Sequence, residues 1–159
     1  MRRVEDRDWL ADTMRQRWDG LVVSRGEVLE PAGLPALVAL DRGGLRLGAL
    51  TFRPRPGSSD GVETEVVTVD ALESGRGVGS LLLDAAATLA RRAGWRRLWP
   101  VTTNDNTAAL RFYQRAGWDL VGFHRNALAR SRVLKPSIPQ MGLDSIPIRH
   151  ELEPELLLP

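Results

Sequence analysis

Cysteine is absent from this sequence of 159 residues. Its absence excludes disulfide bonds, thiolate metal ligands and any covalent intermediate on a cysteine nucleophile. The two histidines, His124 and His150, each stand alone on a predicted strand, without a partner at ligand spacing. We therefore interpret both as structural and predict no metal site. A catalytic site in this chain must therefore transfer a group directly between substrates or use an oxygen nucleophile.

Long apolar runs are also missing, and none reaches the length that crosses a membrane. The first ten residues are rich in charged side chains and contain no apolar core, which is unlike a signal peptide. We therefore predict a cytoplasmic protein with no membrane partner.

The excess of one charge is small, because 22 Lys and Arg residues face 20 Asp and Glu residues. The arginines, among them Arg2, Arg46, Arg91 and Arg149, are spread from one end of the chain to the other. Nucleic-acid binding would need basic residues that cluster on one face. We therefore predict no nucleic-acid partner.

Length and hydrophobic content predict a single domain over residues 1–159. Hydrophobic residues form 43% of the chain, which is enough for one good core, and the chain is too short for two ordinary domains. Charged residues of both signs are dispersed along it, as is typical of a globular protein.

Glycine and proline divide the chain into predicted elements. Helices are predicted at residues 8–18, 79–92 and 107–116, ended by Gly20, Gly94 and Gly117, with Asn106 as the cap of the third. Strands are predicted at residues 21–24, 36–40, 45–52, 63–69, 97–103, 118–124 and 146–152. Residues 41–44 predict a hairpin turn, residues 54–61 a loop, and residues 125–145 a short helix with a loop. This order of elements predicts an α/β fold.

A glycine-rich turn joins the strand at 63–69 to the following helix. Gly75, Gly77 and Gly79 lie at alternate positions in it. Glycine permits close approach of the backbone, and the free N–H groups of a helix N-terminus attract anions. The turn therefore predicts a phosphate site, with a purely structural turn as the alternative. The absence of a Walker lysine and the serine at Ser80 exclude the two common nucleotide motifs.

Two motifs together resemble the acetyl-CoA motifs of the GNAT superfamily of N-acetyltransferases. The first runs from Val69 through Ser74 to Gly77 and Gly79, and the second runs over residues 106–118 as Asn-x-x-Ala-x-x-Phe-Tyr-x-x-x-Gly-Trp. The resemblance covers residues 62–124. It implies a mixed, mostly antiparallel sheet flanked by helices, with a splayed strand pair that holds acetyl-CoA.

The resemblance also implies which residues contact acetyl-CoA as a co-substrate. They are Val67, Val69, Ser74, Gly75, Arg76, Gly77, Val78, Gly79, Ser80, Asn104, Asn106 and Tyr113. The family usually has arginine or glutamine where this chain has Ser74, which is expected to weaken cofactor binding. Arg76 is a candidate replacement donor, and a solvated turn residue is the alternative.

Three catalytic roles are expected. The resemblance implies that the backbone N–H of Val69 faces the thioester carbonyl and that Tyr113 acts as the general acid toward the CoA sulfur. A core tyrosine beside Phe112 is the alternative for Tyr113. Glu63 and Glu65 share one face of a strand, and we favour Glu65 as the general base because it is nearer Val69. Solvent-facing strand positions, paired with arginines of a neighbour, are the alternative for both.

The sequence therefore predicts an enzyme that transfers an acetyl group to a primary amine of a small molecule or protein by direct attack. One alternative is an acyl-CoA sensor without turnover. Another is an interaction protein whose apolar tail, residues 156–158, docks on a partner. Residues 125–145 are expected to form an acceptor-side loop, with Arg130, Arg132 and Lys135 either facing an anionic acceptor or solvated. Both a monomer and a homodimer are open.

Overall fold

The computed structural model describes residues 4–56 and 61–159. The chain divides into two compact units, one from residues 1–22, 30–98 and 157–159, and the other from residues 23–29 and 99–156. The single domain over residues 1–159 stays a prediction. In the described part of the chain, no helix has both the length and the apolar character that a membrane span requires.

The fold mixes helices and strands. The strand pairs whose register is defined are antiparallel. The helices are α1 (Val4–Trp18), α2 (Val78–Arg92), α3 (Thr107–Arg115) and α4 (Ala127–Leu134), with short 3-10 turns η1 (Pro31–Gly33) and η2 (Leu143–Ser145). The strands are β1 (Val22–Ser24), β2 (Glu27–Leu29), β3 (Ala36–Leu40), β4 (Arg46–Pro56), β5 (Val62–Ala71), β6 (Arg97–Pro100), β7 (Thr102–Thr103), β8 (Asp119–His124) and β9 (Glu151–Leu157). The predicted fold class is confirmed.

The sheet of the first unit is built on the hairpin of β3 and β4. The Asp41 carboxylate accepts the N–H groups of Gly43 and Leu45, each at 2.8 Å, which confirms the predicted turn. Strand β4 then pairs with β5 as far as Pro56, so the predicted loop is wrong for residues 54–56. Proline is tolerated there because β3 does not extend that far along β4. Residues 57–60 lie outside the described residues.

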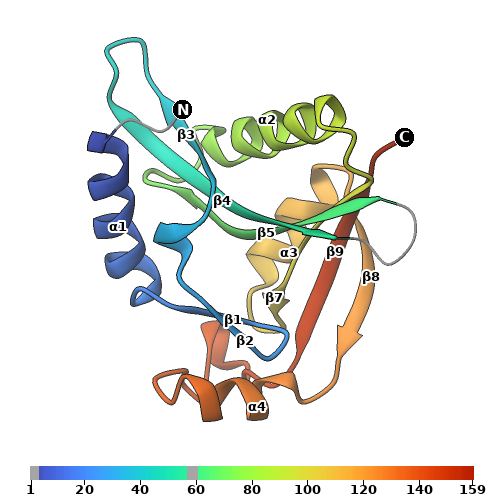
Figure 1. Cartoon of the computed structure of the whole chain (residues 1–159). Helices are drawn as coiled ribbons and strands as arrows, with labels where there is room; N and C mark the ends of the chain where they lie inside the picture. Colours follow the sequence, from blue (N-terminus) through green and yellow to red (C-terminus); the bar gives the residue numbers. More distant parts are fainter. Residues whose placement is uncertain (1–3, 57–60) are drawn as a thin grey trace. The chain divides into compact units, whose positions relative to one another are not determined.

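Helices α1 and α2 cover opposite faces of this sheet (Figure 1). On β4, Ala49 packs with Leu10 and Met14 of α1 in a buried cluster. The preceding residue, Gly48, faces α2, because a Cβ atom built there would lie 3.0 Å from the Val78 side chain. Neighbouring residues of a strand point to opposite faces, so the two helices sandwich the strands.

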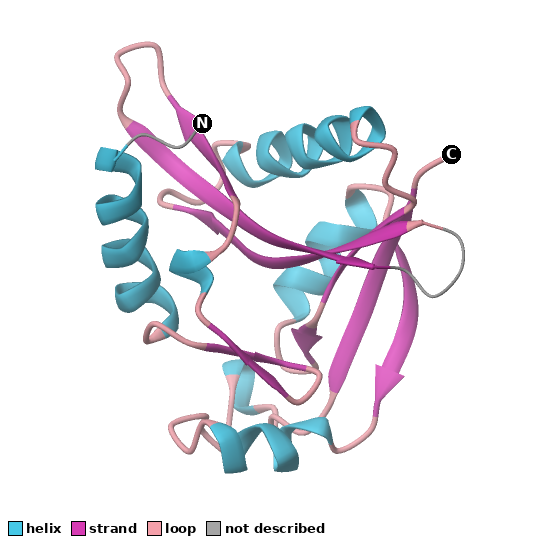
Figure 2. Ribbon diagram, in the orientation of Figure 1, coloured by secondary structure: helices cyan, strands magenta, loops and turns pink. Residues whose placement is uncertain are grey.

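In the second unit, β9 pairs antiparallel with both β7 and β8 (Figure 2). The predicted final strand over 146–152 is wrong for residues 146–150, because β9 begins only at Glu151 and continues to Leu157. The physical reason is that Asn104 Oδ1 accepts the backbone N–H groups of Arg149 and His150, at 2.8 and 2.9 Å, and so withdraws them from a strand ladder. Pro147 also removes a donor from this segment.

Two further boundaries differ from the prediction. Strand β2 was not expected; Arg25 and Gly26, with φ of +50° and +79°, form a two-residue turn that folds β2 back on β1. The expected strand over residues 97–103 is interrupted at Val101 and forms β6 and β7.

The apolar tail is only partly buried in the protein's own fold. Leu156 and Leu157 end β9, and Leu157 is 64% exposed, whereas Leu158 is 6% exposed. The Leu158 N–H donates to the Arg96 carbonyl at 2.9 Å. Leu158 therefore packs within the protein's own fold, and the proposed docking of the tail on a partner stays a prediction.

Candidate functional site

The glycine-rich turn leads from β5 into α2 and is exposed from Leu72 to Gly77. Gly75 and Gly77 have φ of +79° and +74°, and a Cβ atom at either would meet nothing within 4 Å. Gly77 occupies the N-cap position without a side-chain cap, and the first turn of α2 contains no acidic residue. The first helical N–H groups therefore lack intrahelical acceptors, and the turn has the geometry of an anion site.

The side chains of this turn point into solvent and leave the backbone accessible to a ligand. Arg76 pairs with Glu73 at 2.7 Å, and the two side chains are 59% and 68% exposed. An exposed pair of this kind contributes little stability, so Arg76 is able to exchange Glu73 for another anion. Ser74 lies beside them and is exposed.

Strand β5 contains one extra residue relative to β4. Thr51 lies opposite Thr68 and Phe52 opposite Val66, so Val67 has no partner in β4. Such a bulge bends the strand and redirects the side chains beyond it. Val69 follows two residues later. Strand β6 has four residues against ten in β5, so it is too short to pair with all of β5. The splay expected near Val69 stays a prediction.

Because of the bulge, Glu65, Thr68 and Asp70 lie on one face of β5. Residues directly opposite each other share a face. Arg53 lies opposite Glu65 and Ala49 opposite Asp70, and both belong to the face of β4 that carries Ala49 against α1. Without the extra residue, Glu65 and Thr68 would point to opposite faces.

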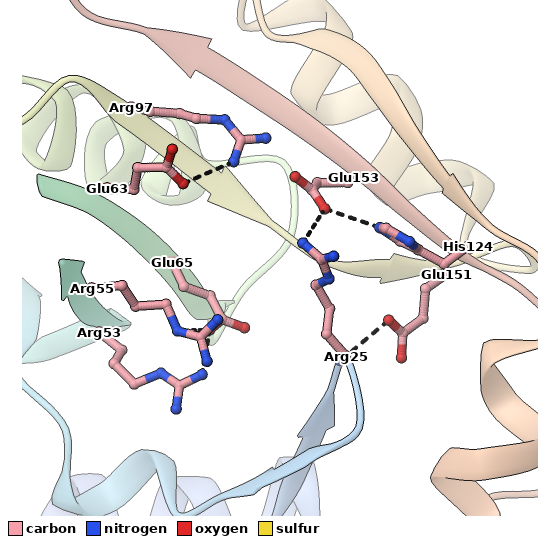
Figure 3. A network of polar contacts seen from close by, with 9 residues as sticks. All are labelled: Arg25, Arg53, Arg55, Glu63, Glu65, Arg97, His124, Glu151 and Glu153. Atoms are coloured by element: carbon pink, nitrogen blue, oxygen red, sulfur yellow. Dashed lines mark hydrogen bonds and ion pairs between the residues drawn. The ribbon is translucent and has the colours of Figure 1, made fainter. Parts of the chain in front are cut away.

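Both candidate bases form ion pairs with arginine, but the alternative of a solvent-facing position is wrong for Glu65, which is buried (Figure 3). The Glu65 side chain is 1% exposed and pairs with Arg53 at 2.9 Å and more distantly with Arg55 at 3.9 Å. Glu63 pairs with Arg97 of β6 at 3.2 Å and is 38% exposed. Strand β5 therefore carries two carboxylates that are both paired with arginine. The role of either carboxylate as a catalytic base stays a prediction.

Sequence reasoning missed Asp70, which directly follows Val69. Asp70 is buried and accepts a hydrogen bond from the Trp18 indole N–H at 2.8 Å, and Arg17 lies 4.0 Å away. Burial raises the pKa of Asp70, and the Trp18 hydrogen bond and Arg17 partly oppose this. The bond ties the end of α1 to β5 next to Val69. A carboxylate inside an otherwise apolar strand end was the signal in the sequence.

In the second unit, α3 carries Tyr113. Asn106 Oδ1 accepts the Ala109 N–H at 3.1 Å, which confirms the predicted helix cap. Tyr113 is 7% exposed, and the centroid of its ring lies 5.3 Å from the centroids of the Phe112 and Trp118 rings. Aromatic packing therefore fixes the ring, and it is compatible with a positioned hydroxyl.

Asn104 has a structural role in this unit. Besides holding Arg149 and His150, its Nδ2 donates to the Pro147 carbonyl at 3.0 Å. Its predicted contact with acetyl-CoA stays a prediction.

A polar cluster on β8 and β9 was not anticipated (Figure 3). Glu153 Oε2 lies 3.2 Å from the Arg25 guanidinium and 3.0 Å from His124 Nε2. Gly122 makes room for it, because a Cβ atom there would lie 2.8 Å from the Glu153 Cβ. Burial raises the pKa of Glu151, and hydrogen bonds from the Arg25 N–H and the Ser131 hydroxyl lower it in part. The alternation of glutamates on one strand face was the signal.

The expected acceptor-side loop consists largely of helix α4 and turn η2. The Arg132 guanidinium donates to the carbonyls of Ile138, Pro139 and Ile148. Arg130 packs against the glycine of the β1–β2 turn, Gly26. Arg132 therefore stabilises the loop itself. Over residues 4–56 and 61–159, no group of His, Asp and Glu side chains could hold a metal ion.

Comparison with known proteins identifies the family. Residues 3–118 match the acetyltransferase (GNAT) family. The chain is 30% identical over 145 residues to the uncharacterised protein YdhI of Bacillus subtilis (strain 168), covering 90% of this chain and 87% of YdhI.

Two solved structures share the fold. An acetyltransferase from Bacillus subtilis in complex with CoA has a TM-score of 0.64 at 16% identity, covering 93% of this chain and 84% of that chain. A GNAT family acetyltransferase from Elizabethkingia anophelis with acetyl-CoA bound has a TM-score of 0.63 at 16% identity, covering 92% and 82%. Since the family match spans more than half of the chain, this protein belongs to the acetyltransferase (GNAT) family.

Proposed function

We propose that this protein transfers an acetyl group from acetyl-CoA to a primary amine of a small molecule or protein. The observation that carries the proposal is the exposed, uncapped glycine turn at the start of α2, in a chain of the acetyltransferase family. A helix N-terminus of this kind suits a pyrophosphate. The binding of CoA and acetyl-CoA by the two neighbouring structures supports the same donor.

The backbone amides of residues 74–80 hold the pyrophosphate in this proposal, and Arg76 adds a charged donor. Acetyl-CoA supplies an activated acyl group, whose carbonyl carbon is attacked by the amine while the C–S bond breaks. The Val69 N–H stabilises the negative charge that develops on the carbonyl oxygen. Glu65, directly or through a water, accepts the proton that leaves the amine.

Tyr113 returns a proton to the departing sulfur. Free phenol and thiol groups have pKa values of roughly 10 and 8.5, so the transfer is modestly uphill and depends on geometry. The aromatic packing of the Tyr113 ring supports this role, because a fixed ring holds its hydroxyl in one direction.

The test is a panel of primary amines assayed for release of free CoA from acetyl-CoA, with matching alcohols as controls. We expect release with at least one amine and none with the alcohols. Acetyl-CoA should also raise the melting temperature with the logarithm of its concentration. No thermal shift at saturating CoA would overturn the donor assignment. A thermal shift without any amine acceptor would favour the acyl-CoA sensor.

Replacing Glu65 with glutamine is expected to lower turnover by about 10²-fold, because glutamine cannot accept the proton that leaves the amine. The matched control is Arg53→Gln, which breaks the same ion pair but keeps the carboxylate. The control should retain most of the turnover, although both variants should lose about 3 kcal/mol of stability because each breaks a largely buried pair. Equal losses of turnover in the two variants would make Glu65 a structural partner of Arg53.

A further inference from the structure

The last turn of helix α1 contacts the end of strand β5 within the first unit. The Trp18 indole N–H donates to Asp70 Oδ2 at 2.8 Å, and the Arg17 guanidinium lies 4.0 Å from Asp70 Oδ1. Arg17 also donates to the Leu72 carbonyl at 3.4 Å. The Asp70 side chain is 6% exposed. The end of α1 is therefore bound to the segment that leads from β5 into the glycine-rich turn.

Val69 lies between two residues whose side chains are both held by α1. On its N-terminal side, the Thr68 hydroxyl donates to Met14 Sδ at 3.7 Å, and Thr68 is buried. On its C-terminal side, Asp70 accepts the hydrogen bond from Trp18. Peptide units are planar, so anchors on both sides leave the backbone between them little freedom to rotate. Helix α1 therefore controls the orientation of the backbone at Val69.

The register of β4 and β5 gives the direction of the Val69 N–H group. Asp70 lies opposite Ala49, and the Leu72 N–H, further along β5, donates to the Leu47 carbonyl at 2.9 Å. Hydrogen-bonded and non-hydrogen-bonded positions alternate along an antiparallel pair. The Asp70 N–H therefore points toward β4, and the Val69 N–H points away from it. This is the direction that the proposed function requires of Val69.

A carboxylate is a costly side chain at this position. Burial removes water from it, and an apolar side chain of similar volume would pack there without that cost. Burial raises the pKa of Asp70, although the Trp18 hydrogen bond and Arg17 oppose this in part. A hydrogen bond has a preferred direction, which apolar packing lacks. The bond therefore specifies one orientation of α1 against β5 that apolar contacts would leave less defined.

From these contacts we infer that Asp70 is a positioning residue for acetyl transfer. Its bond to Trp18 fixes the direction of the Val69 N–H, and with it the stabilisation of the negative charge that develops on the thioester carbonyl oxygen. Asp70 acts through Val69 and takes no part in proton transfer. The inference rests on the proposed function.

Two substitutions of Asp70 separate the hydrogen bond from the charge. Both Asp70→Leu and Asp70→Asn remove the buried charge, but asparagine keeps an oxygen that accepts the Trp18 N–H. With an identified amine, Asp70→Leu should lower kcat about tenfold, part of the roughly 10²- to 10³-fold effect of an oxyanion donor. CoA affinity should change little, and Asp70→Asn should restore most of kcat. A wild-type kcat in Asp70→Leu, or equal losses in both variants, would overturn the inference.

The other end of α1 provides the matched control. Asp6 pairs with Arg46 at 2.9 Å and so joins the start of the same helix to β4. Asp6→Asn weakens this ion pair, and it should lower the melting temperature but leave kcat unchanged. A loss of kcat in Asp6→Asn as large as that in Asp70→Leu would show that any loosening of α1 slows turnover, which contradicts a specific role of Asp70.

The direction of the Val69 N–H is measurable without turnover, by its residual dipolar coupling in the free protein. The coupling should change in Trp18→Phe, which keeps an aromatic ring but lacks the indole donor. It should keep the wild-type value in Asp6→Asn. An unchanged coupling in Trp18→Phe would overturn the inference, whereas a wild type that acetylates no amine would contradict the proposed function alone.

Discussion

Replacing Tyr113 with phenylalanine is expected to lower turnover by about 10²- to 10⁴-fold, the range that a positioned general acid contributes. The phenylalanine ring keeps the packing against Phe112 and Trp118, so only the proton donor is lost. CoA affinity, measured by calorimetry, should change little. Steady-state kinetics with an identified amine provide the turnover number.

Phe112→Leu is the control for this experiment. It removes one of the rings beside Tyr113 but leaves the hydroxyl in place. It should lower the melting temperature and reduce turnover far less than Tyr113→Phe. If Tyr113→Phe turns over at the wild-type rate with a confirmed acceptor, the departing thiolate is protonated by another group or by water.

Replacing Gly77 with aspartate is expected to abolish the stabilisation by CoA. The wild type should gain about 2.7 kcal/mol at a CoA concentration of 100 times Kd. Aspartate places a negative charge where the pyrophosphate approaches, and no neighbouring atom lies within 4 Å of the new Cβ to disturb the fold. Thermal unfolding with and without CoA measures the effect.

Gly94→Asp is the matched control, because Gly94 ends the same helix with a similar φ of +70° and equally open surroundings. Both variants place a side chain in a left-handed conformation and should lose intrinsic stability, with the larger loss in Gly94→Asp because a negative charge is unfavourable at a helix C-terminus. Only Gly77→Asp should lose the thermal shift. A shift that survives in Gly77→Asp would place the phosphate site elsewhere in the chain.

The parts of the fold that were predictable carry local signals. Gly94 and Gly117 adopt positive φ at helix ends, and Asn106 caps α3, so residue type alone marked these boundaries. The turn at Asp41 was equally local. The start of β9 depends on Asn104, which lies more than forty residues earlier and holds the backbone of His150. Pairings of this kind leave no periodic pattern.

In the candidate site too, features with a local sequence signal were predictable and features that depend on distant residues were not. The glycine turn and the second motif were visible because their residue types are constrained at fixed spacing. The partners of Glu65 were not, because Arg53 reaches it through the register of β4 and β5 and the bulge at Val67. A bulge changes the face of every residue beyond it. Neither the composition of the strand nor its alternation of polar and apolar residues shows that it contains an extra residue. The position of Asp70 on the same face as Glu65 depends on this bulge.

The first unit is assembled from segments that lie far apart in the sequence, and this affects how the chain folds during synthesis on the ribosome. Residues 157–159 belong to this unit, although residues 99–156 of the second unit separate them from the rest of it. The bond from the Leu158 N–H to the Arg96 carbonyl cannot form until residue 158 has left the ribosome. Domains that fold as they emerge usually complete their N-terminal part first. Here the N-terminal unit is completed last, so the nascent chain must wait for its final strand before either unit is whole.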